Sequence, residues 1–263
     1  MRSASLNRSR APARRSKARR VGLARALSKL GYCSRSQAAE LIRAGRVSLN
    51  GLAQRDPETP VSLDRDRITV DDRAVGSTTK IYWMLNKPRG VITSASDEKG
   101  RETVYECLPQ QASWLAPVGR LDKASEGLLL LTNDSEWAAR ITAPETHLDK
   151  VYHVQITALP DASLLEKIVR GVRSKSGELL RAKSVRVLRV GEKNAWLVIV
   201  LDEGKNRQIR RMFEALGIEV LRLVRVAMGP LQLGDLPKGK YRPVVADELH
   251  ALGLAMRGRE RLI

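Results

Sequence analysis

Cysteine and histidine are scarce in this sequence. The chain of 263 residues holds only two cysteines, Cys33 and Cys107, and they lie far apart. Two distant cysteines provide neither a disulfide framework nor the ligand set of a structural zinc site. The three histidines, at positions 147, 153 and 250, also lack metal-ligand spacing with acids or cysteines. These absences argue against metal-assisted hydrolysis, predict no metal site and favour a reducing compartment, the cytoplasm.

Long apolar runs and nucleotide-binding loops are missing as well. No run approaches the roughly 20 apolar residues that cross a bilayer, and no signal-peptide core follows the basic N-terminus. Gly204 and Lys205 are followed by Asn206 rather than by the Ser or Thr of a phosphate-binding loop, and neither a G-x-G-x-x-G fingerprint nor a G-x-S-x-G elbow occurs. We therefore expect a soluble protein with no membrane partner, whose chemistry uses side chains and no cofactor.

Acidic residues are outnumbered by basic ones, 29 to 47, which gives a formal net charge of +18. Residues 1–20 carry eight Lys or Arg and no acid, so the other 243 residues keep +10 of that charge. The first segment cannot bury enough apolar surface to offset its ordering entropy, and we interpret it as a disordered basic tail. A basic body with a basic tail favours nucleic acid as the partner. The alternatives for the tail are solubility or an organelle transit peptide, which would change the localisation.

Residues 21–75 predict a small domain of two helices and short strands. VGLARALSKLG places Leu23, Leu27 and Leu30 on one helical face, and SRSQAAELIRAG predicts a second helix. RVSLNG then predicts a strand that ends in Asn50-Gly51, a strong hairpin signal, and RITV (67–70) predicts another. Charge alone does not decide whether the basic residues of this region form a solvated face or bind phosphates; they are Arg25, Lys29, Arg35, Arg43 and Arg46.

A boundary is expected at residues 76–79, GSTT, and a larger domain at 80–249. Strand patterns occupy residues 81–85, 150–156, 184–190, 194–200 and 219–226, and helical patterns occupy 161–171 and 206–217. Several alternating strands with few helices between them favour a mixed, mostly antiparallel sheet over a doubly wound one. The chain is thus predicted to be α+β, with a C-terminal tail at 250–263.

Three features of the larger domain are candidate site residues, and each has an ordinary alternative. Asp122 precedes the run SEGLLLLT, and an isolated Asp is commonly a cap or a loop carboxylate. Tyr152 shares a strand face with Val154 and Ile156, as a half-buried structural tyrosine would.

The third feature is the helical pattern at 206–217. Its apolar stripe consists of Ile209, Met212, Phe213 and Leu216. At 100° per residue the stripe turns Arg207 and Arg211 away from the core and leaves Arg210 at its border. Of these, only Arg210 is expected to reach an inward-lying carboxylate.

The small domain carries a resemblance to a known family. Its segment SRSQAAELIRAGRVSLNG keeps the pattern S-R-x-x-A-x-x-L-I-x-x-G-R-V-x-x-N-G. Over roughly residues 21–70 this resembles the alpha-L RNA-binding domain found in ribosomal proteins, some tRNA synthetases and RNA-modifying enzymes. The resemblance implies structured RNA as the partner, with contacts from Arg25, Arg35, Arg43 and Arg46.

The larger domain resembles a second family. GRLDKASEGLLLLTND (119–134) is followed by KVY (150–152) and EGKNRQIRRM (203–212), and NKPRG (86–90) and the segment 225–242 match as well. Over roughly residues 80–249 these motifs resemble the pseudouridine synthases of the ribosomal small- and large-subunit type. Members of that family often carry an alpha-L domain in front, so both resemblances point to one kind of protein.

The second resemblance implies a reaction and its residues. A specific uridine of ribosomal RNA would be isomerised to pseudouridine without a cofactor, by cleavage of its glycosidic bond and reattachment through C5. Asp122 would be the catalytic carboxylate, Tyr152 would stack on the target base, and Arg210 would pair with the carboxylate. The phosphates of the flipped nucleotide would be held by cationic residues: Lys87, Arg120, Lys123 and Arg207.

Several alternatives stay open. Chain length and basic extensions favour large-subunit ribosomal RNA over small-subunit RNA, either free or in a ribosomal assembly intermediate. A non-catalytic ribosome-assembly factor or a regulator of messenger RNA would use the same alpha-L domain and tail, but would leave the GRLD constellation unexplained. We expect a monomer.

The basic tail yields the first prediction. Deletion of residues 1–20 is expected to weaken RNA binding at low salt and to flatten its salt dependence, because each neutralised phosphate contributes roughly 0.7 to 0.9 to the log–log slope. The modified uridine should stay the same, which pseudouridine mapping checks. A change of position after the deletion would show instead that the tail reads the RNA.

Overall fold

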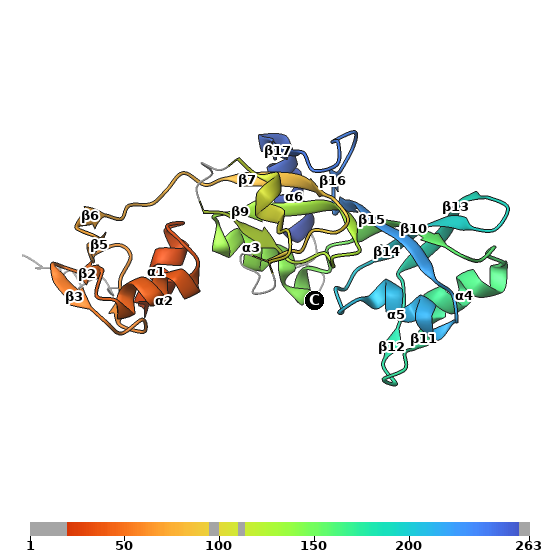
Figure 1. Cartoon of the computed structure of the whole chain (residues 1–263), viewed down its shortest axis with the longest axis horizontal. Coiled ribbons are helices and arrows are strands. Elements are labelled where there is room, and N and C mark those ends of the chain that lie inside the picture. The colour runs from red at the N-terminus through yellow and green to blue at the C-terminus, as the bar shows by residue number, and fades with distance from the viewer. Residues whose placement is uncertain (1–19, 95–99, 110–113, 258–263) are drawn as a thin grey trace, which may run out of the picture. The chain divides into compact units, whose positions relative to one another are not determined.

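The structure is a computed structural model that describes residues 20–94, 100–109 and 114–257 (Figure 1). All but the last residue of the expected basic tail, 1–20, lies outside this range. Contacts divide the chain into two compact units. The first contains the chain up to Leu27 and Arg35–Gly76, and the second contains Ser28–Ser34 and the chain from Ser77 onward. Within the described ranges no helix has the length and apolar character needed to cross a membrane.

The first unit combines short helices with a small antiparallel sheet. Helix α1 (Leu23–Lys29) begins in this unit, and α2 (Arg35–Arg43) follows. The sheet has the order β3-β2-β5-β6, and a separate pair joins β1 (Val21–Gly22) to β4 (Pro60–Val61). Its strands are β2 (Val47–Leu49), β3 (Leu52–Gln54), β5 (Ile68–Val70) and β6 (Arg73–Ala74).

Local sequence explains the turn and the core of this unit. Asn50 and Gly51 both have positive φ, 53° and 86°, as the hairpin between β2 and β3 requires. Leu23 and Leu27 are fully buried, whereas α1 ends before Leu30, which is only partly buried. The expected leucine face is therefore one turn shorter than the pattern suggested.

The second unit is built on a mixed, mostly antiparallel sheet, as expected. Among the described residues it has nine strands, in the order β13-β14-β10-β15-β9-β7-β17, with β16 paired to β15 and β8 paired to β9. The strands are β7 (Tyr82–Lys87), β8 (Ala116–Val118), β9 (Glu126–Thr132), β10 (Lys150–Ile156), β13 (Ser184–Val190), β14 (Ala195–Leu201), β15 (Val220–Met228), β16 (Leu231–Gln232) and β17 (Tyr241–Pro243). β7 runs two residues beyond the predicted stop at residue 85.

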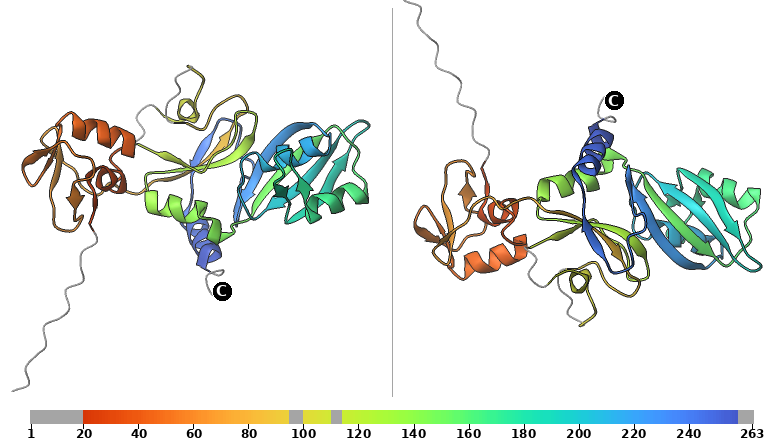
Figure 2. Two further views of the ribbon diagram at one scale, coloured as in Figure 1. Left: turned by 90° about the horizontal axis from the view of Figure 1, so that it is seen from below. Right: turned by 90° about the horizontal axis from the view of Figure 1, so that it is seen from above.

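Helices cover this sheet unevenly. α3 (Ser135–Thr142) and α6 (Ala246–Arg257) pack beside β9 and β7, and α4 (Ala162–Arg170) and α5 (Gln208–Ala215) pack on one face of β13, β14, β10 and β15. In Figure 2 these last two helices lie in front of their strands from below and behind them from above. A small hairpin, β11 (Val172–Arg173) with β12 (Leu179–Leu180), joins the same layer. Because α6 runs from Ala246 to Arg257, the expected C-terminal tail from residue 250 is wrong for the residues up to 257.

The leucine run after Asp122 forms the central strand β9. Leu128 and Leu130 pack with Met84, α3 and α6, whereas Leu129 and Leu131 pack into a second cluster on the opposite face. All four are fully buried. A strand covered on both faces needs apolar residues at consecutive positions, which explains the run.

A short parallel pairing joins the two halves of the sheet. β9 and β15 pair in parallel through Glu126 with Val224 and Gly127 with Arg225, whereas the other strand pairs of this sheet are antiparallel. Gly127 has φ +102°, and a Cβ there would lie 2.2 Å from the Arg225 carbonyl oxygen. Only glycine fits this approach of two backbones.

The junction yields the second prediction. Gly127→Ala is expected to lower the free energy of unfolding by about 2 to 5 kcal/mol, because a positive φ costs about 1 to 2 and an overpacked site about 1 to 3. Gly177→Ala is the matched control, since Gly177 has φ +82° and nothing within 4 Å of the added Cβ. Chemical denaturation of both variants measures the difference, and equal losses would contradict the role of the close approach.

Candidate active site

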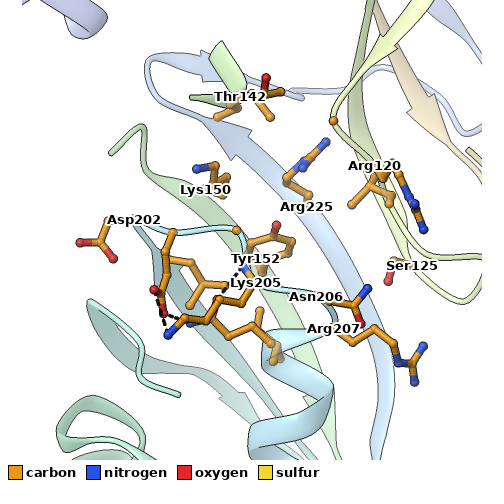
Figure 3. A pocket seen from close by; sticks show the side chains of 18 of the residues that line it. Arg120, Ser125, Thr142, Lys150, Tyr152, Asp202, Lys205, Asn206, Arg207 and Arg225 are labelled. Atoms are coloured by element: carbon orange, nitrogen blue, oxygen red, sulfur yellow. Dashed lines mark hydrogen bonds and ion pairs between the residues drawn. The ribbon is translucent and has the colours of Figure 1, made fainter. Parts of the chain in front are cut away.

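A pocket of about 760 Å³ opens in the second unit where its two half-sheets meet. Its walls come from the loop after β8, from β10 and β15, and from the loop that leads into α5 (Figure 3). Both apolar and charged side chains line it, among them Leu201, Ile209, Leu223, Asp122, Tyr152, Arg207 and Arg225. The pocket therefore combines apolar surface for a base with charged groups for a sugar and phosphates.

Asp122 lies in the loop between β8 and β9. The loop turns through a hydrogen bond from the Ser125 N–H to the Asp122 carbonyl oxygen, 2.9 Å, and the next element is a strand. Asp122 is therefore not a helix cap. Its side chain is 28% exposed and forms an ion pair with Arg207, with Nη1 and Oδ2 3.7 Å apart. The carboxylate is thus partly withdrawn from water and faces one cation in the pocket.

Lys87, expected to hold phosphates, does not lie in the pocket. Its side chain is fully buried, and Nζ donates hydrogen bonds to the carbonyl oxygens of Pro88 (3.0 Å), Asp122 (3.2 Å) and Ser125 (2.9 Å). Burial lowers the pKa of the ammonium group to about 8. The phosphate-binding prediction is wrong for Lys87, because its three donors bond to backbone carbonyl oxygens, two of them in the Asp122 loop.

Arg207, and not Arg210 as expected, contacts the carboxylate of Asp122. Arg207 precedes α5 as its N-cap residue and has a left-handed backbone, φ 48°, so helical spacing does not apply to it. Its half-exposed side chain reaches Asp122. Arg210 donates instead to the carbonyl oxygens of Ala124 (2.9 Å) and Val220 (3.2 Å), and no direct ion pair with Asp122 is found among the described residues.

Arg210 nevertheless belongs to the site through the backbone that it holds. Its bonds to Ala124 and to Val220 connect the Asp122 loop to the start of β15. Burial first, and then the positive charge of Arg207, lower the pKa of Arg210. The predicted direct pairing is wrong for this structure, whereas the predicted position at the border of the core holds.

Tyr152 lies on β10 at the pocket wall, half-buried between two apolar clusters. Its strand neighbour in register is Arg225, a residue that the sequence analysis left without a role. Arg225 is only 4% exposed, its Nε donates to the Leu128 carbonyl oxygen (2.7 Å), and its Nη2 has no partner within the described chain. Figure 3 places its side chain beside Tyr152. The signal that could have found it is a charged residue amid the apolar positions of β15.

The remaining basic candidates are distributed over both units. Arg120 is exposed at the pocket, and Lys123 is exposed but outside the pocket lining. In the first unit Arg25, Arg35 and Arg43 are exposed on or beside the helices. Arg46 is exposed too but forms an ion pair with Asp71. Across the described residues, His, Cys, Asp and Glu do not gather in threes as a metal site would require.

The comparison with known proteins agrees with this geometry. The family model of the RNA pseudouridylate synthases matches residues 81–215, and that of the S4 domain, the domain also called alpha-L, matches residues 21–68. The chain is 38% identical over 240 residues to ribosomal large subunit pseudouridine synthase B of Bacillus subtilis, covering 90% of this chain and 98% of the relative. It is 37% identical, again over 240 residues, to an uncharacterized RNA pseudouridine synthase of Aquifex aeolicus, covering 89% and 96%.

A solved structure described as a pseudouridylate synthase aligns with 88% of this chain and 99% of its own, at a TM-score of 0.63 and 29% identity. Together these matches define an RNA-modifying isomerase with an N-terminal S4 domain. The chain belongs to the RNA pseudouridylate synthase family.

Lys87 yields the third prediction. The ammonium group has a pKa of about 8 in the fold and 10.5 as its ordinary value, so the unfolded chain binds more protons between these pH values. The contribution of Lys87 to the free energy of unfolding therefore rises with pH, by about 2 kcal/mol from pH 7.5 to 9.5. Lys87→Met should remove that rise.

The test compares denaturation of the wild type and Lys87→Met at pH 7.5, 8.5 and 9.5. The variant should also form pseudouridine at least about tenfold more slowly, because three buried carbonyl oxygens lose their shared donor and the Asp122 loop shifts. Parallel stability curves for the two proteins would contradict the buried, weakened ammonium.

Proposed function

We propose that this RNA pseudouridine synthase isomerises a uridine of large-subunit ribosomal RNA, with Asp122 as its catalytic carboxylate. The observation that carries the proposal is the Asp122 carboxylate in a pocket that also holds Tyr152 and Arg207. The rRNA assignment is supported by the similarity to the Bacillus subtilis enzyme, by the S4 domain and by the net charge of +18. The domain division into a docking part before residue 76 and a chemical part after it belongs to the same proposal.

The reaction moves one bond and one proton. The carboxylate of Asp122 attacks or assists at C1′ of the ribose while the bond from C1′ to N1 of uracil breaks. The uracil turns in the pocket, C5 bonds to C1′ as any bond from C1′ to the carboxylate breaks, and the C5 proton is lost while N1 gains one. No atom is added or removed overall, so the reaction needs no external reactant.

Each pocket residue has a role in this scheme. Tyr152 provides the surface on which the target base stacks and assists removal of the C5 proton. Arg207 offsets the cost of keeping an ionised carboxylate partly out of water, which an unpaired acid would meet by neutralising itself. Lys87 and Arg210 act as positioning residues, because both bond to the backbone of the loop that carries Asp122.

Access to the pocket requires the uridine to leave its RNA stack. Extrusion of a nucleotide costs a few kcal/mol, which contacts to the flipped nucleotide offset. Arg120 and Arg207 lie at the pocket, and their exposed side chains are suited to hold the flanking phosphates. Lys123, also exposed, extends the same basic margin.

The fourth prediction concerns Asp122. Asp122→Asn keeps the size of the side chain but removes its charge, so we expect a folded protein that binds RNA about as well and forms no detectable pseudouridine. The loss corresponds to at least several kcal/mol in the activation barrier. The test measures folding by melting temperature, RNA binding by affinity and catalysis by single-turnover isomerisation, all on one preparation.

The exposed Asp235→Asn is the matched control, because it removes the same charge far from the pocket lining. Cells that lack the gene, complemented with either variant, connect the chemistry to its target by pseudouridine mapping of both ribosomal RNAs. We expect one pseudouridine of the large-subunit RNA to be missing in cells with Asp122→Asn and present in cells with Asp235→Asn. An active Asp122→Asn enzyme would sink the mechanism, and a small-subunit position would sink the rRNA assignment alone.

A further inference from the structure

Within the described residues, no helix covers one face of the half-sheet formed by β13, β14, β10 and β15. The side chains of these four strands alternate between the two faces. The apolar set packs against α4 and α5, and the other set lies on the opposite face. In the view from above in Figure 2 these strands lie in front with the helices behind them. We call this second side the open face and define it by two transverse rows of side chains.

The rows follow from the strand register. The first row runs Arg186, Val198, His153, Val224, and the second runs Arg189, Trp196, Gln155, Arg222, from β13 across to β15. Neighbouring strands are about 4.8 Å apart, and residues two apart along a strand are about 7 Å apart. The open face therefore has arginines on the edge strand β13 and again on β15.

The arginines of the open face differ in whether they form ion pairs. Arg222 forms a bidentate ion pair with the buried Glu126, which Lys238 also contacts. Arg186 and Arg189 are exposed and have no ion-pair partner within the described ranges. Two positive charges on the edge strand are thus uncompensated by the fold.

Trp196 contacts two arginines of the open face. The guanidinium groups of Arg189 on β13 and Arg222 on β15 lie 5.0 and 5.5 Å from the centre of its ring. Cation–π contacts of this kind limit the motion of a guanidinium while leaving its N–H groups available to a ligand. Arg189 is therefore ordered before any ligand arrives, which lowers the entropic cost of binding.

His153 reports the sign of the local field. Burial first, and then the positive charges of Arg186 and Arg189, lower the pKa of its imidazole. Within the described residues the charges that lower this pKa are both positive, so Arg186 and Arg189 make the local field at His153 positive. A polyanion is the partner that complements such a field.

We propose that the open face binds the phosphate backbone of the RNA substrate, at a segment apart from the target uridine, through Arg186 and Arg189. The pocket lies on the side that carries α5, so the same RNA reaches the open face around the edge strand β13 or through a second segment of a folded RNA. The proposal rests on RNA as the substrate class. It is independent of which uridine is modified and of the role of Asp122.

The test uses a short RNA hairpin made only of A, G and C, which offers no uridine to the pocket. Arg186→Glu combined with Arg189→Glu in the full-length protein is expected to weaken binding at least about tenfold at low salt. It should reduce the log–log salt slope by about 1 to 2, since each lost phosphate contact removes roughly 0.7 to 0.9.

The matched control is Lys167→Glu combined with Arg170→Glu. Both residues are exposed on α4, on the other side of the same strands, and the change in net charge is identical. The control should retain at least half of the wild-type affinity. Equal losses in the two double variants would overturn the proposal, because they would show a dependence on net charge alone.

A local measurement separates contact from charge. In the wild type the hairpin should raise the pKa of His153, followed by NMR titration of its imidazole, because phosphates would neutralise Arg186 and Arg189. The double variant at those arginines should start from a higher His153 pKa and show no rise with RNA. An unchanged His153 pKa in RNA-saturated wild-type protein would also overturn the proposal.

Discussion

The buried ammonium group of Lys87 is the interaction on which the site geometry depends. It bonds to three carbonyl oxygens, two of them in the loop that carries Asp122. Arg210 holds the same loop from α5 through Ala124. Two cations therefore act on backbone rather than on substrate, and both hold the loop that carries Asp122. The proposed catalytic carboxylate of Asp122 thus lies on a loop that two cations hold by hydrogen bonds, which limits its departure from a productive position.

Much of the fold could be predicted because local rules and burial agree. The strands β10 and β13 have the bounds that their patterns predicted, and the Asn50-Gly51 hairpin has the positive φ values that its residues favour. The unbroken leucine run of β9 follows from burial on both faces. The site motif was found by resemblance, since Asp122 and Tyr152 taken singly were compatible with ordinary structural roles. Their convergence on one pocket is a property of the sheet and is not visible in either strand alone.

The errors share one cause, which is that side-chain direction depends on backbone that spacing does not describe. Arg207 was assigned to a helix, but its left-handed backbone places it outside the helix and turns it toward Asp122. Lys87 is expected to hold phosphates, yet it ends strand β7 and its ammonium group bonds to three backbone carbonyl oxygens. The unpartnered nitrogen of Arg225 and the helix through Ala246–Arg257 were missed because tertiary packing decides them.

The edges of the large sheet have a consequence for the behaviour of the protein at high concentration. Exposed edge strands are templates for pairing with another chain, and aggregation begins there. β17 is three residues long and ends in Pro243, which has no N–H to offer. β13 is longer, but its ladder slips between Val187 and Arg189, and its exposed arginines would meet their own copies in any edge-to-edge pairing. The bulge and the arginines of β13 thus oppose the addition of a strand from another molecule. The protein is therefore less prone to aggregate through the edge of its large sheet.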